Sequence, residues 1–160
     1  MARRSSNPEG RDPWAVALRM LARRDYGTNE LRQRLQAKGF PAEAVDTVIA
    51  RGIDLGYLDD ARHVEQLSRT LLSTGRATGP RLLQELRRRA LPEELISAAV
   101  SASRAAGAED AALRALIARR FPTFDFSAAG ERERRRVVSF LQRRGFPLGR
   151  ILNELKRTDT

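Results

Sequence analysis

Apolar residues recur along most of this chain at the spacing of one helix face, and strict strand-like alternation is scarce. From Pro13 onward, apolar positions three or four residues apart are separated by short polar breaks, which is typical of amphipathic helices. The pattern therefore predicts an all-α protein. The expected helices cover residues 13–25, 29–38, 41–55, 60–75, 79–90, 92–105, 108–120, 131–144 and 147–157.

The chain also repeats itself. Segments 30–41, 81–92 and 136–147 align without a gap, at offsets of 51 and then 55 residues. Self-similarity at such a period is typical of stacked helical repeats. The shared positions are the leucines Leu35, Leu86 and Leu141, the apolar residues Phe40, Leu91 and Phe146, the prolines Pro41, Pro92 and Pro147, and the β-branched residues Val45, Ile96 and Ile151.

The repeat predicts a domain organisation. We expect a flexible N-terminal tail over 1–13 and three-helix repeats over 14–58, 59–106 and 107–157. A unit of about 45 residues has a marginal core on its own, so neighbouring units should stack. The predicted molecule is an elongated, curved row of three repeats.

The breaks between helices carry recognisable signals. Thr28 is expected to cap the second helix, Gly39 to provide the left-handed turn after it, and Pro41 to lie in the first turn of the third helix. In the last repeat the first connection, "PTFDFSAAG" at 122–130, is longer than its counterparts. We expect it to form a packed surface loop.

The stretch "GYLDDARHVEQL" at 56–67 places Asp59 and Asp60 just before His63, the only histidine. These residues offer too few ligands for a metal site, and the chain has no cysteine to complete one. An aspartate before a helix accepts hydrogen bonds from first-turn N–H groups and complements the helix dipole. We therefore interpret the pair as helix capping, with no metal and no cofactor.

Composition narrows the function further. The 160 residues are 41% hydrophobic and carry a net charge of +10, which indicates an anionic partner. No apolar run is long enough to span a bilayer, and the N-terminus lacks a signal-peptide centre. "GRATGP" at 75–80 lacks the Gly-Lys-Ser/Thr of a phosphate loop. We expect a cytoplasmic, monomeric protein that is neither an enzyme nor associated with a membrane.

The charge is concentrated in two helices. Residues 131–157 carry nine basic and three acidic side chains, and residues 67–92 carry six and one. Projection at 100° per residue places the arginines opposite the apolar side, whereas the equivalent positions of the first repeat are not basic. A solvated face is the alternative interpretation. The predicted partner-binding residues form an arginine stripe: Arg81, Arg87, Arg88, Arg132, Arg135, Arg136 and Arg143.

Three motifs carry a resemblance to a known family. "GYLDDARHVEQL", "GRATGPRLLQELRRRALPEELI" and "FLQRRGFPLGRILNEL" resemble the RecX family, in the expected order and over residues 14–157. The resemblance implies a regulatory protein that binds the groove of the RecA filament on single-stranded DNA. It also implies inhibition of filament extension, ATP hydrolysis, strand exchange and co-protease activity. The arginine stripe comes from the projection and not from the family.

Two positions depart from the family pattern. His63 stands where an aromatic residue is usual, so looser packing is expected there. Ala90 replaces the glycine that Gly39 and Gly145 provide in the other repeats, so another residue of that turn is expected to adapt.

Other functions stay open at this stage. A nonspecific DNA-binding helical-repeat module is the main alternative, because three-helix units resemble helix-turn-helix domains. Against it, the outward faces have few base-reading side chains and lack aromatic platforms for single strands. Weak, salt-dependent binding to single- or double-stranded DNA is still expected. A passive helical scaffold for another acidic protein is a second alternative.

Overall fold

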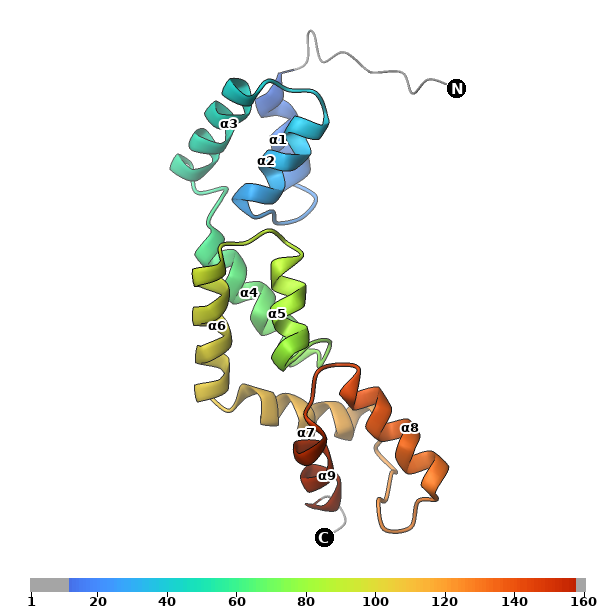
Figure 1. Ribbon diagram of the computed structural model, residues 1–160. Helices are drawn as coiled ribbons and strands as arrows, with labels where there is room; N and C mark the ends of the chain where they lie inside the picture. The colour runs from blue at the N-terminus through green and yellow to red at the C-terminus, as the bar shows by residue number, and fades with distance from the viewer. Residues whose placement is uncertain (1–11, 158–160) are drawn as a thin grey trace, which may run out of the picture. The chain divides into compact units, whose positions relative to one another are not determined.

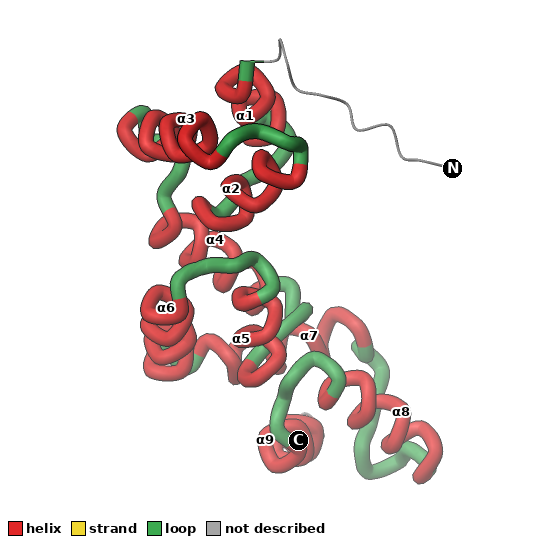
Figure 2. The backbone as a smooth tube through the Cα atoms, turned by 45° about the horizontal axis from the view of Figure 1, so that its top comes forward, coloured by secondary structure: helices red, strands yellow, loops and turns green. Residues whose placement is uncertain are grey.

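The computed structural model describes residues 12–157, which contain nine α-helices and no strand (Figures 1 and 2). The prediction of an all-α protein is confirmed, and each described helix starts within one residue of the expected position. Most of the predicted tail, 1–11, lies outside the described residues. The helices are α1 (Pro13–Leu21), α2 (Thr28–Ala37), α3 (Ala42–Asp54), α4 (Asp60–Ser73), α5 (Gly79–Arg87), α6 (Glu93–Ala105), α7 (Ala108–Arg120), α8 (Glu131–Gln142) and α9 (Leu148–Arg157).

The helices follow one another as three sets of three, which confirms the tandem helical repeats. In every set the second helix packs against the third, and α1 and α7 also pack against the third helix of their own sets. The described residues form two compact units. The first comprises 12–63 with 89–92, and the second comprises 64–88 with 93–157.

The repeated apolar positions form the core. Leu35, Leu86 and Leu141 have no exposed surface, and Val45, Ile96 and Ile151 are equally buried. In the first unit, residues of α1, α2 and α3 join one hydrophobic cluster. In the second unit, α7, α8 and α9 build another, against which Phe121, Phe124 and Phe126 pack. The prediction of a packed loop after α7 is therefore confirmed.

The start of α2 differs from the prediction. Thr28 is the first residue of the helix. The N-cap position is occupied by Gly27, which has no side chain to accept a hydrogen bond. The Thr28 amide instead donates to Asp60 Oδ1 at 2.7 Å. The expected Thr28 cap was wrong because a carboxylate from a distant segment takes that role. Pro41 likewise lies one residue before α3, at its N-cap.

The turn after each repeat's second helix uses the left-handed region. Gly39 and Gly145 have φ values of 90° and 97°, and Ala90 adopts 52°. Ala90 is the only described residue other than glycine with a positive φ. The expectation that another residue would adapt was therefore wrong. Ala90 itself takes the conformation, which costs about 1–2 kcal/mol in a residue with a Cβ.

In the second unit, the segment "GRATGP" closes a seam between two repeats. Thr78 donates from its amide (2.8 Å) and from its hydroxyl (3.3 Å) to the carbonyl of Arg144. The Gly79 amide donates to Oε1 of Glu109 at 3.2 Å, and Glu109 is 6% exposed. Gly145 lies so close that an added Cβ would overlap the Thr78 carbonyl oxygen. This stretch is therefore a packing motif.

Replacing Gly145 with alanine should destabilise the protein by roughly 2–4 kcal/mol, because a Cβ meets both a left-handed backbone and the Thr78 carbonyl. Denaturant unfolding followed by circular dichroism measures the loss. Gly149→Ala is the matched control, since no atom lies within 4 Å of its added Cβ; it should be neutral or stabilising. Equal effects of the two substitutions would contradict the seam.

Replacing Ala90 with glycine should instead increase the stability of the protein. Relief of the left-handed strain outweighs the extra entropy of an unfolded glycine, so we expect a net gain of about 0.5–1 kcal/mol. The same unfolding measurement detects it. Ala98→Gly, at an exposed site in the middle of α6, should lose stability. A loss at position 90 would show that the turn is not strained.

Candidate partner-binding surface

The arginines of α5 and its end are held by local carboxylates. Arg81 lies 2.8 Å from Glu85 at the closest N–O pair, and Arg88 lies 3.6 Å from the same carboxylate. Arg87 pairs with Glu93 at the start of α6, with Nε donating to Oε2 over 3.0 Å. All three guanidinium groups are exposed. A partner must compete with these carboxylates for them.

The arginines of α8 are mostly free of such pairs. Arg135 pairs with Glu131 one turn earlier. Within residues 12–157, no carboxylate lies within ion-pair distance of Arg132, Arg136 or Arg143. These three side chains are exposed. The stripe is therefore divided into a neutralised part on α5 and a part on α8 that keeps its positive charge.

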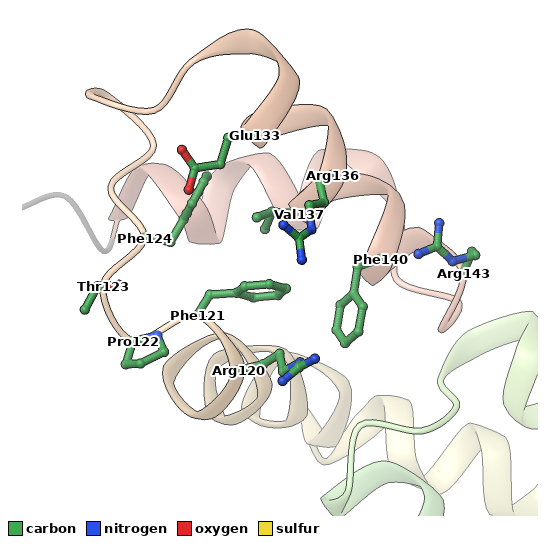
Figure 3. A pocket seen from close by; sticks show the side chains of 10 residues that line it. All are labelled: Arg120, Phe121, Pro122, Thr123, Phe124, Glu133, Arg136, Val137, Phe140 and Arg143. Carbon is green, nitrogen blue, oxygen red and sulfur yellow. The ribbon is translucent and has the colours of Figure 1, made fainter.

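Arg136 and Arg143 also line a cavity of about 480 Å³ between the end of α7 and α8, here called the α7–α8 pocket (Figure 3). Arg120 supplies a third guanidinium, and Phe121, Phe124 and Phe140 supply aromatic surface. The predicted stripe did not include Arg120 or any aromatic residue. Phe140 is only partly buried and lines the pocket beside these arginines.

A signal for this pocket is present in the sequence. Three of the six phenylalanines fall within residues 121–126, directly after Arg119 and Arg120. Their rings form edge-on contacts: Phe121 meets Phe140 at 87° with centroids 5.2 Å apart, and meets Phe124 at 61° over 6.5 Å. Such geometry is favourable for aromatic pairs. The clustering of phenylalanines next to arginines in the sequence is therefore the signal that indicates this pocket.

Arg144 borders the pocket beside Phe140. Its guanidinium carbon lies 3.6 Å from the Phe140 ring centroid, and its Nη1 donates to the Phe140 carbonyl at 3.3 Å. Burial lowers the pKa of Arg144, and the like charges of Arg143 and Arg120 lower it further. The end of α8 is thus a cluster of cations that repel one another, and an anion would relieve that repulsion.

A second, shallower hollow of about 440 Å³ adjoins this cluster, here called the α5–α8 hollow. Arg81 from α5 and Arg143 from the end of α8 both line it, with Gln84 and Gln142 beside them. The seam at Thr78 brings these segments together. The structure therefore places one stripe residue of each helix in a shared depression. Neither cavity is lined by the other four residues of the stripe, which are Arg87, Arg88, Arg132 and Arg135.

The aspartates near His63 serve as caps, but for two different helices. Asp59 Oδ1 accepts the Arg62 amide at 3.0 Å, and its carbonyl accepts the His63 amide, as expected for the residue that starts α4. Asp60 instead caps α2 through Thr28. The capping interpretation is confirmed, with Asp60 assigned to the wrong helix. No group of potential ligands among residues 12–157 could hold a metal ion.

Comparisons with known proteins identify the family. Two RecX family profiles match this chain, the first three-helix domain over residues 14–51 and the third three-helix domain over 108–152. The "Regulatory protein RecX" of Syntrophotalea carbinolica is 39% identical over 135 residues, covering 84% of this chain and 88% of that protein. The chain belongs to the RecX family.

Further RecX proteins agree with this assignment. The "Regulatory protein RecX" of Trichlorobacter lovleyi is 47% identical over the same share of both chains. A crystal structure of RecX from Lactobacillus salivarius matches with a TM-score of 0.70 at 17% identity, covering 92% of this chain and 94% of that one. At that identity the structural match shows the fold alone. No helix among residues 12–157 has the length and apolar character needed to cross a membrane.

His63, the departure from the RecX pattern, is half-buried in the first unit. Its Nε2 is buried without a hydrogen-bond partner among the described residues. Burial lowers the pKa of His63, and Arg89 lowers it further. The carboxylates of Asp25, Asp60 and Glu30 oppose the shift. Burial therefore favours the neutral form of the imidazole, although charged side chains lie near it.

The lowered pKa of His63 predicts a pH dependence of stability. The neutral ring contributes fully above the unfolded pKa of about 6.5, and this contribution is lost as the pH falls through the lower folded pKa. The free energy of unfolding should therefore decrease between about pH 7.5 and about pH 5.5 more steeply in the wild type than in His63→Phe. Denaturant titrations at each pH provide the slopes. Parallel slopes would show that His63 does not titrate differently on folding.

Proposed function

We propose that this chain regulates the RecA recombinase by binding the groove of the RecA filament on single-stranded DNA. In this proposal it opposes filament extension and thereby lowers ATP hydrolysis, strand exchange and co-protease activity. Its membership of the RecX family supports the proposal, because the curated relatives that it matches are named as regulatory proteins. A cytoplasmic location and a monomeric state belong to the same proposal.

The charge distribution on α8 is the observation that supports this role most directly. Arg132, Arg136 and Arg143 are exposed and have no carboxylate partner within residues 12–157. Guanidinium groups bind carboxylates and phosphates bidentately, and these are the groups that a protein filament on DNA presents.

The division of the stripe refines the proposal. Arg81, Arg87 and Arg88 are already paired with Glu85 or Glu93, so exchanging those partners for a filament carboxylate yields little net energy. The unpaired arginines of α8 exchange only water for a partner. We therefore place the main contribution to filament affinity on α8, with α5 in a supporting role.

Reversing the three unpaired charges tests this function. The variant Arg132→Glu/Arg136→Glu/Arg143→Glu should require at least about tenfold more protein to inhibit ATP hydrolysis by RecA on single-stranded DNA, because each charged hydrogen bond removed costs about 1.5–3 kcal/mol. Helicity should not change, since all three side chains are exposed to solvent. A coupled ATPase assay with increasing amounts of the protein gives the concentration for half inhibition.

Arg19→Glu/Arg23→Glu/Arg76→Glu is the matched control, with the same change in net charge at exposed positions outside α8. It should inhibit nearly as well as the wild type. Equal loss in both variants would reduce the effect to net charge, and full inhibition by the α8 variant would remove α8 from the interface. Absence of inhibition by the wild type would overturn the proposed function itself.

A further inference from the structure

The α7–α8 pocket combines features that ion pairing with a protein does not require. A flat cationic surface is enough to attract acidic side chains, but this pocket is a half-open hollow of about 480 Å³. That volume lies within the range of roughly 300–1,000 Å³ typical of small-ligand sites. Figure 3 shows the Arg136 side chain directed from α8 toward the space beside Phe121 and Phe140, while Arg120 approaches from the end of α7. The cavity is thus both charged and aromatic.

The guanidinium groups define one half of the ligand. Arg120, Arg136 and Arg143 line the pocket and have no ion-pair partner among the described residues, and Arg144 adds a fourth positive charge at its border. Concentrated, mutually repelling cations favour a compact anion with several acceptor oxygens. A phosphate group meets that requirement, because it accepts bidentate hydrogen bonds from arginine.

The aromatic side chains define the other half. Phe121, Phe124 and Phe140 are partly buried, so each keeps some surface at the pocket. Their edge-on packing against one another fixes the ring orientations, and Arg144 holds Phe140 from one face. A planar, uncharged ring system can stack on such a surface with a gain typical of base–aromatic contacts.

Glu133 decides between two kinds of ligand. Its carboxylate lines the same pocket on the side of Phe124 (Figure 3). An acidic peptide would bring its own carboxylates next to this charge, at an electrostatic cost. A nucleobase carries N–H groups on its edge, and a carboxylate accepts hydrogen bonds from them. The mixed lining therefore matches a ligand that is anionic at one end and a hydrogen-bond donor at the other.

We propose that the α7–α8 pocket binds a nucleotide, with the phosphate on Arg120, Arg136 and Arg143 and the base on the phenylalanines. This site shares Arg136 and Arg143 with the proposed filament surface, but nucleotide binding in it does not require the RecA protein. Arg143 also lines the adjoining α5–α8 hollow together with Arg81. A nucleotide that belongs to a strand can place its next phosphate there, whereas a free nucleotide occupies the pocket alone.

Direct binding without the recombinase tests the proposal. Fluorescence anisotropy is measured on the full chain with a short single-stranded oligothymidine and with an oligomer of equal length that lacks the bases. Stacking of one base should make the first about tenfold tighter. Competition with thymidine monophosphate and with a short polyglutamate peptide completes the set. Displacement by the mononucleotide at concentrations similar to the oligomer identifies a free nucleotide as the ligand, and weaker displacement identifies a strand.

Matched arginine pairs localise the binding. Arg136→Gln/Arg143→Gln should weaken oligomer binding at least about tenfold and reduce the slope of log K against log salt by about 0.7 for each phosphate that no longer binds an arginine. Arg132→Gln/Arg135→Gln removes the same charge from the same helix outside the pocket, and should change affinity much less. Phe121→Leu should abolish the difference between the base-bearing and abasic oligomers and leave the salt slope unchanged.

Several results would overturn the nucleotide site. Equal binding of the base-bearing and abasic oligomers would leave only charge attraction. Equal losses of affinity in the two arginine pairs would place binding outside the pocket. Polyglutamate that binds more tightly than the oligomer, and that depends on Arg136 and Arg143, would assign the pocket to an acidic peptide. If Phe121→Leu fails to fold, as seen by circular dichroism, the arginine pairs and the abasic oligomer still decide the question.

Discussion

The second unit depends on one contact, the pair of hydrogen bonds from the amide and the hydroxyl of Thr78 to the carbonyl of Arg144. It requires a glycine at 145, because any side chain there would overlap Thr78. The contact joins the start of α5 to the end of α8, so that Arg81 and Arg143 line one hollow. Glu109 strengthens the junction from α7 by accepting the Gly79 amide and pairing with Arg150 at 3.4 Å. The position of the cationic surface is therefore a consequence of a neutral packing contact.

The number of arginines on a helix differs from the number that are free to bind a partner. The two basic helices are similar in sequence, but α5 lies beside Glu85 and Glu93, whereas Arg132 and Arg136 of α8 and Arg143 at its end have no carboxylate partner among the described residues. Exposed ion pairs contribute little to stability. Their larger effect here is that they make the arginines of α5 less available to an external partner. Function is therefore expected to concentrate where the internal carboxylates are missing.

The fold was largely predictable from the sequence, because each repeat encodes its core locally. Leu35, Leu86 and Leu141 stand at equivalent positions, and helical periodicity alone places them inside. Asp60 was misassigned because its partner Thr28 lies 32 residues away, and local capping rules do not see such a contact. Projection of α8 by itself could not show that the loop after α7 leaves Phe140 at a pocket beside Arg136. Ala90 adopts the left-handed conformation of Gly39 and Gly145, its equivalents in the other repeats, although alanine disfavours that conformation.

The bond from Asp60 to Thr28 has a consequence for how this chain can be divided. The repeat period sets a boundary near residue 58, yet the carboxylate that completes α2 belongs to α4, beyond that boundary. Leu91 also lies against Gly27, and segment 89–92 is part of the first unit. A fragment cut at the sequence boundary would leave an amide of α2 without its acceptor and remove a neighbour of Gly27. The period in the sequence and the smallest self-sufficient piece of the protein are therefore not the same length.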